Sequence, residues 1–336
     1  MNTPLIKGIK VRNFRGIREG ELKLSPLTIL IGPNNSGKTT ILEALLLSHG
    51  IRELFKGVSV PKLLMELHEV LGSRSLKHLI YTYGARAKRA CIEYNVNGKT
   101  STLIILLVGS RMNFYVVNAG IDQAMEIGDK KLKSLNILAS LGHEGGGTLG
   151  AKYLTDALFI RYDILRKSHE FLYSVWEELT YKGLTCKVAE WISKAVSEDF
   201  TDLTAEPFAG KSCIYLYRSD KVRIRLSDLG DGAHMLVVAR LLVDYLNPNL
   251  ILWDDIESHM NPRMLFLLAY WLADLVDNGK QVVLTTHSLE AVETISRIVE
   301  NASIVRLSLV NGILEARYLD VNEVNKLKKL GIDART

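Results

Sequence analysis

Three segments of the sequence predict an α/β fold built around a parallel sheet. In each of them an apolar strand ends at a turn of polar residues that could bind a ligand or take part in catalysis. Strand 27–31 leads into the glycine-rich turn 32–40, strand 249–253 into two carboxylates, and strand 281–286 into a histidine. Strands that alternate with helices are typical of parallel sheets, and the carboxyl ends of such strands share one edge that faces the ligand crevice. We therefore expect these three turns to meet in one cleft.

The first turn, GPNNSGKTT at 32–40, matches the phosphate-binding pattern G-x-x-x-x-G-K-[ST], so the predicted fold is that of a P-loop NTPase. In this pattern glycines let backbone N–H groups converge on phosphate oxygens, the lysine reaches the β and γ phosphates, and the hydroxyl that follows contacts Mg²⁺. The pattern alone occurs by chance in roughly one chain in a hundred of this length. The strand before it and the helix after it favour a nucleotide over a glycine turn without ligand. The expected phosphate-binding residues are Gly32, Asn34, Asn35, Ser36, Gly37, Lys38, Thr39 and Thr40.

The amino-acid composition indicates a globular protein and gives no sign of a membrane-spanning, secreted or disulfide-rich one. The 336 residues are 47% hydrophobic and 24% charged, which suffices for one large or two medium domains with a full core. The longest wholly apolar stretch, around 103–108, is far shorter than the ~20 residues that span a bilayer, and no signal-peptide pattern opens the chain. We expect a cytoplasmic protein without a membrane segment. The three cysteines are scattered and suggest neither disulfides nor zinc.

A net charge of +5 permits nucleic-acid binding without indicating it. The basic clusters at 86–89 and 130–133 are more often solvated faces than DNA contacts, so both interpretations stay open. A GTPase is disfavoured because no guanine-reading N-K-x-D motif follows the glycine loop.

Three lobes are predicted along the chain. Alternating residues at 6–14 and 21–24 indicate an antiparallel flank ahead of the P-loop strand, with helices at 39–49 and 61–71 and a second sheet at 89–118 that turns at Asn97-Gly98. From 130 to 200 the pattern is helical, interrupted by a glycine-rich loop at 143–148 that we interpret as a connector and not a ligand cradle. The expected lobes are an N-terminal β/P-loop lobe at 1–125, an inserted helical lobe at 126–210 and a C-terminal lobe at 211–336.

The two later strand ends supply groups that a nucleotide site requires. Asp254 can hold Mg²⁺ and Asp255 can orient the attacking water, although two carboxylates after a buried strand can also form a solvated turn. His287 stands where an imidazole could donate to a γ-phosphate, and Ser288 could cap the helix that follows. Between these strands and the predicted helical lobe, LSDLGDG at 226–232 opens a buried helix, whose N-terminal N–H groups form an anion site. Because the chain already has a phosphate loop, this second anion site implies a second nucleotide face.

These four motifs, in this order, resemble the ABC-type ATPases of the SMC, RecF and OLD-like branch. GPNNSGKTT resembles the Walker A motif, LSDLGDG the signature motif, LILWDDIESHMNP the Walker B strand with its following loop, and TTHSLE the switch histidine. The segment Asn13-Phe14-Arg15-Gly16 looks like the opening segment of the family. The resemblance implies an ABC ATPase head with a mixed sheet, an antiparallel β subdomain and an inserted helical lobe. From this sequence we expect neither coiled-coil arms nor an appended nuclease domain.

The resemblance also implies an ATPase that dimerises head to head, with ATP and Mg²⁺ between Walker A of one chain and the signature turn of the other. Carried over residue by residue, the catalytic candidates are Lys38, Asp255, Glu257 and His287. The metal candidates are Thr39, Asp254 and, as a match to the Q-loop glutamine, Gln123. The further nucleotide-binding candidates are Arg12, Arg15, Ser227, Gly230 and Gly232.

One departure from the family pattern affects the expected rate. The family usually has Glu where this chain has Asp255, whose carboxylate reaches about 1.5 Å less, so hydrolysis is expected to be slow unless Glu257 assists. Two functions therefore stay open. The first is an ATPase in DNA maintenance or genome defence that works on DNA or on a partner such as a nuclease. The second is a slow nucleotide-loaded switch that controls a partner protein with little hydrolysis.

Overall fold

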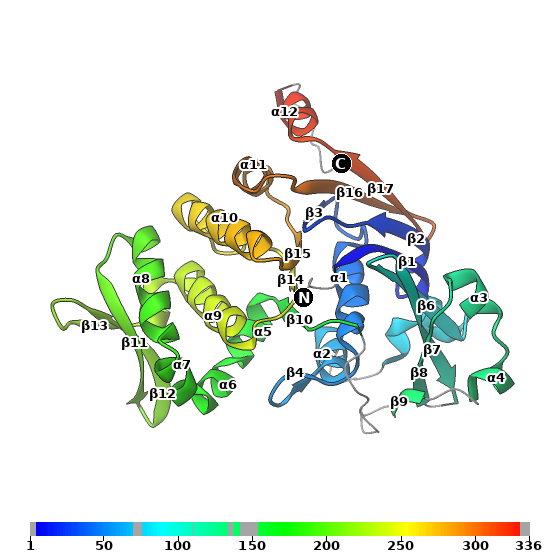
Figure 1. Ribbon diagram of the computed structural model, residues 1–336, viewed down its shortest axis with the longest axis horizontal. Helices are drawn as coiled ribbons and strands as arrows, with labels where there is room; N and C mark the ends of the chain where they lie inside the picture. Colours follow the sequence, from blue (N-terminus) through cyan, green and yellow to red (C-terminus); the bar gives the residue numbers. More distant parts are fainter. Residues whose placement is uncertain (1–4, 70–75, 110, 134–136, 142–153, 330–336) are drawn as a thin grey trace.

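Helices cover both sides of one large mixed sheet. The computed structural model describes residues 5–69, 76–109, 111–133, 137–141 and 154–329, and its central layer is a twelve-stranded sheet. Helix α1 (Lys38–Leu46) lies on one side of the parallel strands, and α9 (Asp231–Leu246), α10 (Pro262–Asp277) and α11 (Leu289–Ile298) lie on the other (Figure 1). Covering both faces is what a parallel sheet needs, because its strands are apolar on both faces. The predicted α/β P-loop fold is confirmed.

The parallel part of the sheet brings the sequence motifs to one edge. Its strand order is β10-β14-β15-β3-β16, with all four pairings parallel. Every residue of β3, β10, β14 and β15 is buried. Because parallel strands end at the same edge, the turns after β3, β14 and β15 become neighbours. The bounds of these strands are β3 Leu27–Ile31, β10 Ala157–Ile160, β14 Leu250–Trp253, β15 Gln281–Thr285 and β16 Ser303–Val310.

The remaining strands extend the same sheet, largely in antiparallel order. β16 pairs with β17, β17 joins β2 in parallel, and β2-β1-β6-β7-β8-β9 continue antiparallel. The prediction of a separate second sheet at 89–118 is wrong, because β1 pairs with β2 on one side and with β6 on the other. Both Asn97 and Gly98 have positive φ, 50° and 81°, as the predicted hairpin turn between β6 and β7 requires. The bounds are β1 Ile6–Phe14, β2 Ile17–Lys23, β6 Arg89–Val96, β7 Lys99–Val108, β8 Arg111–Val117, β9 Ile137–Leu141 and β17 Ile313–Leu319.

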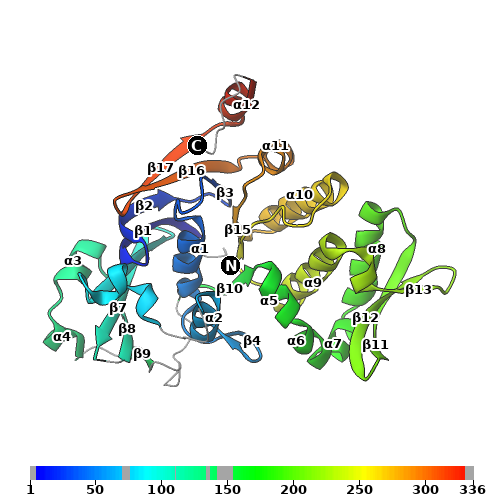
Figure 2. The same ribbon diagram turned by 180° about the vertical axis from the view of Figure 1, so that it is seen from behind.

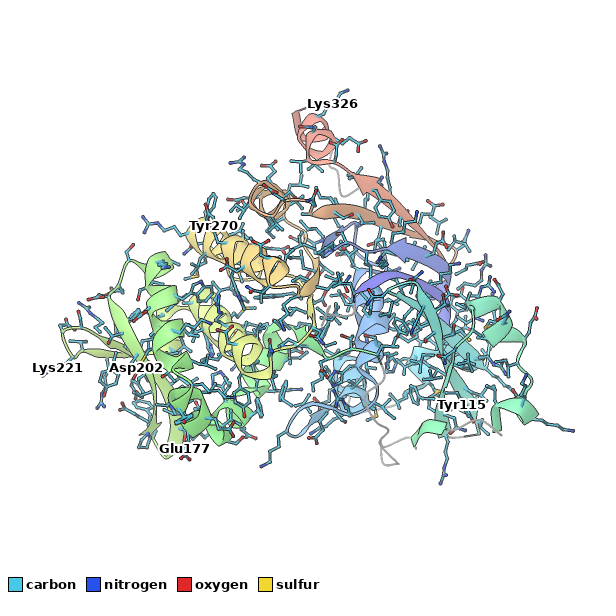
Figure 3. The ribbon with its side chains drawn as sticks, in the orientation of Figure 1. Tyr115, Glu177, Asp202, Lys221, Tyr270 and Lys326 are labelled. Carbon is cyan, nitrogen blue, oxygen red and sulfur yellow. The ribbon has the colours of Figure 1, made fainter. Side chains whose placement is uncertain are left out.

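A second lobe lies at the opposite end of the molecule from β7–β9. It consists of four helices and a three-stranded antiparallel sheet that packs on α8, the longest of the four. Figure 2 shows the two β regions at opposite ends, and in Figure 3 the labelled Tyr115 and Lys221 mark these ends. The elements of this lobe are α5 Tyr162–Lys167, α6 His169–Ser174, α7 Trp176–Tyr181, α8 Leu184–Val196, β11 Phe200–Phe208, β12 Lys211–Arg218 and β13 Arg223–Arg225.

The segment expected to be helical, 126–210, also contains strands. β10 belongs to the parallel core, and the boundary at 210 falls in the turn between β11 and β12, which pair along their lengths. The division into three lobes stays a prediction, and the glycine-rich loop at 143–148 lies outside the described residues. The shorter elements are η1 Leu47–His49, β4 Glu53–Phe55, β5 Val58–Ser59, α2 Val60–Leu67, η2 Leu76–Leu79, η3 Tyr81–Gly84, α3 Ile121–Glu126, α4 Asp129–Lys133, η4 Leu226–Leu229 and α12 Val321–Lys329.

A buried glutamine fixes the N-terminal strand to the parallel core. The side-chain oxygen of Gln281 accepts a hydrogen bond from the Ile6 N–H at 2.9 Å, and its amide nitrogen donates to the carbonyl oxygens of Ile6 and Ser25 at 2.8 and 3.2 Å. Such a residue satisfies backbone groups that would otherwise be buried without partners. Gln281 therefore has a structural role at the start of β15.

The short contact between β2 and β17 depends on a glycine, which gives a stability prediction. A Cβ atom at Gly20 would lie 2.5 Å from Cβ of Leu314, a buried residue of β17. We expect Gly20→Ala to lower the free energy of unfolding by about 1–3 kcal/mol, since overpacking forces side chains or backbone to shift. Chemical denaturation measures the change. Gly8→Ala is the control, because its Cβ would meet only a carbonyl oxygen at 3.4 Å; equal stability of the two variants would contradict the prediction.

Candidate active site

The glycine loop connects β3 to α1 and is held against β16. Gly32 has a φ of +146°, and a Cβ atom there would lie 2.4 Å from the carbonyl oxygen of Leu307. The loop backbone therefore approaches β16 too closely for any side chain at this position. Lys38 is buried, and its Nζ donates to the carbonyl oxygens of Gly32 and Pro33, both at 2.9 Å. Burial lowers the pKa of Lys38, and the charges of Asp255, Asp254 and Glu257 oppose this effect.

The first pair of predicted residues that the structure brings together is Thr39 and Asp254. The Thr39 hydroxyl donates to the Asp254 carboxylate at 3.2 and 3.3 Å, although the residues are 215 positions apart. Thr285 at the end of β15 donates to the same carboxylate at 2.8 Å. Asp254 is only 4% exposed, and its burial raises its pKa while the hydrogen bond from Thr285 opposes the rise. A buried carboxylate beside a threonine hydroxyl is a donor pair that suits Mg²⁺.

The donor set can hold Mg²⁺ only together with other ligands. Among the described residues, no group of three or more His, Cys, Asp or Glu side chains is arranged to hold a metal ion. Mg²⁺ at nucleotide sites usually keeps several waters and takes one or two protein oxygens plus phosphate oxygens. The pair of Thr39 and Asp254 fits that requirement.

The second group is formed by Asp255, Glu257 and His287. Asp255 has a positive φ of 51°, its N–H donates to the Thr285 hydroxyl at 2.8 Å, and its carboxylate lies 3.9 Å from Nε2 of His287. Glu257 accepts a hydrogen bond from the backbone N–H of His287 at 2.6 Å. The three residues therefore stand together next to Asp254, at the ends of two adjacent strands. Ser288 caps α11, as predicted, by accepting from the N–H of Ala291 at 3.2 Å.

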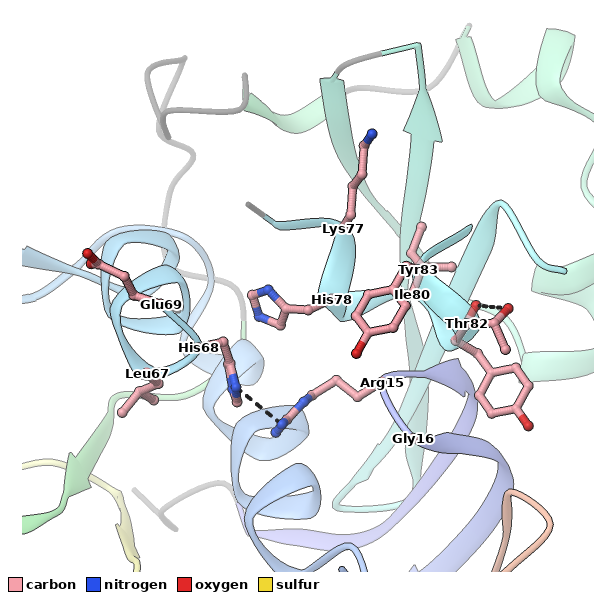
Figure 4. A pocket seen from close by; sticks show the side chains of 11 residues that line it. Arg15, Gly16, Leu67, His68, Glu69, Lys77, His78, Ile80, Thr82 and Tyr83 are labelled. Atoms are coloured by element: carbon pink, nitrogen blue, oxygen red, sulfur yellow. Dashed lines mark hydrogen bonds between the residues drawn. The ribbon is translucent and has the colours of Figure 1, made fainter. Parts of the chain in front are cut away.

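The predicted basic residues of β1 make other contacts. Arg12 pairs with Asp122 at 2.6 Å and with Glu19 at 3.1 Å. Arg15 pairs with the fully buried Glu43 of α1, and its Nη2 lies 3.4 Å from Nδ1 of His68. Figure 4 shows Arg15 pointing toward His68 along the wall of a cavity of about 740 Å³ between the β1–β2 turn, the end of α2, η2 and η3. Within the described part of the chain, neither arginine forms a hydrogen bond or an ion pair with residues 32–40.

Gln123 is not brought to the Thr39 and Asp254 pair. It is exposed on α3, a helix that packs on β6 and β7 in the antiparallel part of the sheet. Asp254 instead follows β14, on the far side of β3 from those strands. A role for Gln123 as a metal ligand has no support from these contacts and stays a prediction.

The signature turn connects β13 of the second lobe to α9 of the same chain. Ser227 is exposed in η4, Gly230 precedes α9 with a φ of 91°, and α9 begins at Asp231, two residues earlier than predicted. A Cβ at Gly232 would lie 2.3 Å from the carbonyl oxygen of His259, so the turn packs tightly on the loop after β14. Across 226–232 and 32–40, both fully described, no hydrogen bond or ion pair connects the turn to the glycine loop.

Sequence reasoning missed Arg161 and Thr285. Arg161 follows β10, next to β14, and its charge acts to lower the pKa of Asp254. Arg161 directly follows β10, so the rule that functional residues stand at strand ends would have located it if β10 had been predicted. Thr285 is the last residue of β15 and lies inside the strand predicted at 281–286. Both residues therefore surround Asp254 with groups that favour its ionised form.

Comparison with known proteins agrees with this arrangement. The family model described as "AAA ATPase domain" matches residues 5–106, and the model "AAA domain, putative AbiEii toxin, Type IV TA system" matches residues 158–293. The chain is 49% identical over 41 residues to the OLD nuclease of Thermus scotoductus, covering 12% of this chain and 8% of that protein. It is 35% identical over 79 residues to the Uncharacterized protein MJECL10 of Methanocaldococcus jannaschii, covering 23% and 36%. These matches span well under half the length of either relative.

Solved structures of SMC heads share the fold. An SmcHead bound to the C-winged helix domain of ScpA aligns with a TM-score of 0.59 and 13% identity, covering 96% of this chain and 100% of that one. The Pyrococcus furiosus Smc head with an extended coiled coil, bound to the C-terminal domain of ScpA, gives 0.57 and 13%, covering 97% and 99%. The SMC head domain of Thermotoga maritima gives 0.51 and 16%, covering 94% and 99%.

The fold and the strand-end motifs define a P-loop ATPase of the AAA/ABC type. More particularly, the chain is similar in sequence to a 41-residue segment of the OLD nuclease and similar in fold to SMC heads. A P-loop of this class generally binds ATP together with Mg²⁺. None of the helices in the described part of the chain has the length and apolar character needed to span a bilayer.

Because the pKa of Asp254 is raised, neutralising this residue should stabilise the nucleotide-free fold and weaken the binding of Mg²⁺ and ATP. A carboxyl group whose folded pKa lies above its unfolded value destabilises the fold when it is ionised, so its neutral analogue is more stable at pH 7. We expect Asp254→Asn to raise the Tm of the nucleotide-free protein by about 2 °C and to abolish the further rise that Mg²⁺ and ATP produce. The Tm difference should shrink as the pH falls and Asp254 becomes protonated. A thermal shift assay from pH 4 to 8 measures both effects; a lower Tm at pH 7 would contradict the sign.

Proposed function

We propose that this protein hydrolyses ATP in sites that two copies of the chain build together. The main support is the contact between the Thr39 hydroxyl and the Asp254 carboxylate, which joins two motifs 215 residues apart. Among the described residues, the side-chain hydrogen-bond partners of the buried Asp254 are the neutral hydroxyls of Thr39 and Thr285, and a structural role alone does not explain a carboxylate buried in this way. A divalent cation held between this carboxylate and the phosphates of ATP would place a positive charge directly beside it.

In this proposal, separate residues bind the phosphates, hold the metal ion and accept the proton of the attacking water. The N–H groups of the glycine loop and the Lys38 ammonium hold the β and γ phosphates, while Thr39 and Asp254 hold Mg²⁺, which would withdraw charge from those phosphates. His287, just after β15, donates to the γ-phosphate. A carboxylate of the loop after β14, from Asp255 or Glu257, takes the proton of the attacking water.

The need for a second copy is inferred from the signature turn. Gly230 and Asp231 open a 16-residue helix whose N-terminal N–H groups can bind an anion. The turn makes its tight contact with His259 and has no hydrogen bond to the glycine loop of its own chain. We infer that Ser227, Gly230 and Gly232 contact the γ-phosphate held by the partner's Walker A loop.

The test is the rate of ATP hydrolysis per chain against protein concentration, with Lys38→Ala as the blank. A specific rate that rises with concentration supports a site shared between two chains. A flat rate above the blank means either that one chain acts alone or that the dimer is permanent, and the molar mass with and without ATP then separates these cases. A rate equal to the blank overturns the proposed hydrolysis.

A second candidate function is a slow nucleotide-loaded switch. The Asp255 side chain is 51% exposed and shorter than the glutamate usual in this class, which favours slow hydrolysis. In that case ATP would be retained in a stable dimer, and a partner protein would bind only to that form. Long occupancy after removal of free ATP would favour the switch, whereas turnover stimulated by DNA would favour the enzyme.

The client is proposed to be DNA or a protein that acts on DNA. The OLD nuclease among the relatives and the toxin–antitoxin family description point to DNA maintenance or genome defence. The basic clusters give limited support, because Arg89 is used inside the molecule: it donates to three carbonyl oxygens around α3 and pairs with Asp129. DNA binding measured against salt concentration tests this part, since phosphate contacts weaken steeply with added salt.

A further inference from the structure

Glu257 has one oxygen in use and one without a partner. Its Oε1 accepts the hydrogen bond from the His287 N–H, and this contact fixes the position of the carboxylate at the end of β15. Its Oε2 is buried and, among the described residues, has no hydrogen-bond partner. A buried, unsatisfied acceptor costs about 1–3 kcal/mol, so such a group at a functional site calls for a functional explanation.

Asp255 differs from Glu257 in each of these respects. Half of its side chain is exposed, and its carboxylate lies 3.9 Å from Nε2 of His287, beyond hydrogen-bond distance. Its backbone is in the left-handed region, which few residues other than glycine, asparagine and aspartate adopt. An exposed carboxylate that no hydrogen bond fixes is a poor means of positioning a water molecule, because a general base must be held within hydrogen-bond reach.

Both carboxylates follow β14, at the edge of the sheet where β3 leads into the glycine loop. The charges of Asp255, Asp254 and Glu257 all act on Lys38, whose ammonium group lies in the glycine loop. Glu257 accepts from the N–H of His287 just after β15, which pairs with β3, so its free oxygen lies at the sheet edge that carries the phosphate-binding loop.

We propose that Glu257, and not Asp255, is the carboxylate that accepts the proton of the attacking water. The proposal rests on the proposed ATPase function and assigns a residue within it. The water oxygen forms a bond to the γ-phosphorus as the bond from that phosphorus to the bridging oxygen of ADP breaks. One water proton passes to Oε2 of Glu257, and the products are ADP and inorganic phosphate. The proton returns to solvent when the site opens.

The isosteric variant Glu257→Gln separates proton transfer from positioning. A glutamine keeps a side-chain oxygen that can accept from the His287 N–H, but it cannot take a proton from water. If Glu257 only held His287 in place, Glu257→Gln would retain most of the activity and Glu257→Ala would lose it.

The experiment measures single-turnover hydrolysis of pre-bound ATP by the full chain at neutral pH. We expect Glu257→Gln to be slower by at least about 100-fold with ATP affinity retained. Asp255→Asn should lose less than about tenfold. Glu300→Gln, at an exposed residue beyond α11, is the matched control and should equal the unchanged protein.

Three results would overturn the assignment. A larger loss in Asp255→Asn than in Glu257→Gln would return the role to Asp255, and equal losses would show that the two act as a unit. An active Glu257→Gln with an inactive Glu257→Ala would reduce Glu257 to a positioning residue. Absence of hydrolysis in the unchanged protein is a different failure, because it removes the ATPase function itself along with this assignment.

Discussion

Lys38→Ala is expected to abolish ATP hydrolysis and the thermal stabilisation by ATP while leaving the nucleotide-free fold intact. The ammonium group is buried against the carbonyl oxygens of Gly32 and Pro33, and burial lowers its pKa. Removing it deletes the only cation of the glycine loop, which in this class of protein stabilises the charge that develops on the phosphates. We expect the hydrolysis rate to fall by at least about 100-fold.

The measurement pairs a phosphate-release assay with a thermal shift assay at saturating Mg²⁺ and ATP. Lys62→Ala is the control, because Lys62 of α2 lies on the surface and its Nζ bonds only a loop carbonyl, that of Gly57. The control should keep the full rate and the full shift. A Lys38→Ala protein that still gains several degrees on adding ATP would show that the loop backbone alone binds the nucleotide, and one that still hydrolyses it would exclude 32–40 as the site.

Mixing two inactive variants is expected to restore hydrolysis. In a head-to-head dimer each site takes Walker A from one chain and the signature turn from the other, so Lys38→Ala damages one half and Ser227→Arg the other. Ser227 is exposed in η4, and a surface substitution there should change stability by less than about 0.5 kcal/mol. In a mixed dimer one site carries both lesions and the other carries none.

The expected recovery can be estimated. If equal amounts of the variants exchange freely, half of the dimers are mixed and each contains one intact site of two, which predicts roughly a quarter of the unchanged rate if the sites act independently. The assay measures each variant alone and then the mixture over time. Ser227→Arg alone, at twice its concentration in the mixture, serves as the control. A mixture that stays as inactive as its components would exclude the shared site.

The parallel core could be predicted from sequence because its strands end at motifs with fixed chemistry. GPNNSGKTT, the aspartates after β14 and the histidine after β15 each mark the carboxyl end of a strand, and parallel strands bring such ends together. The contact of Thr39 with Asp254 follows from that rule. The hairpin at Asn97-Gly98 could also be predicted, since that dipeptide favours positive φ at both positions.

Other parts of the fold leave no local trace in the sequence. β10 is four buried residues, ALFI, and so short an apolar run cannot be distinguished from a piece of helix by its period. Whether β6–β8 form their own sheet depends on the pairing of β1 with β6, a contact between segments about 80 residues apart that no turn signal announces. Gln123 was matched to a family residue without a motif around it, and its exposed position on α3 reflects that weakness.

The buried hydrogen bonds of Gln281 bear on how the chain reaches its folded state. Ile6 and Gln281 are 275 residues apart, and β3 lies between β15 and β16, which both come from the last fifth of the chain. Contacts of such long range make folding slow, because the entropy of closing the loop must be lost before any bond forms. On a ribosome, the glycine loop emerges early but gains both neighbouring strands only near the end of synthesis. We therefore expect nascent chains that stop before Gln281 to lack affinity for ATP, even though they contain the complete phosphate-binding motif.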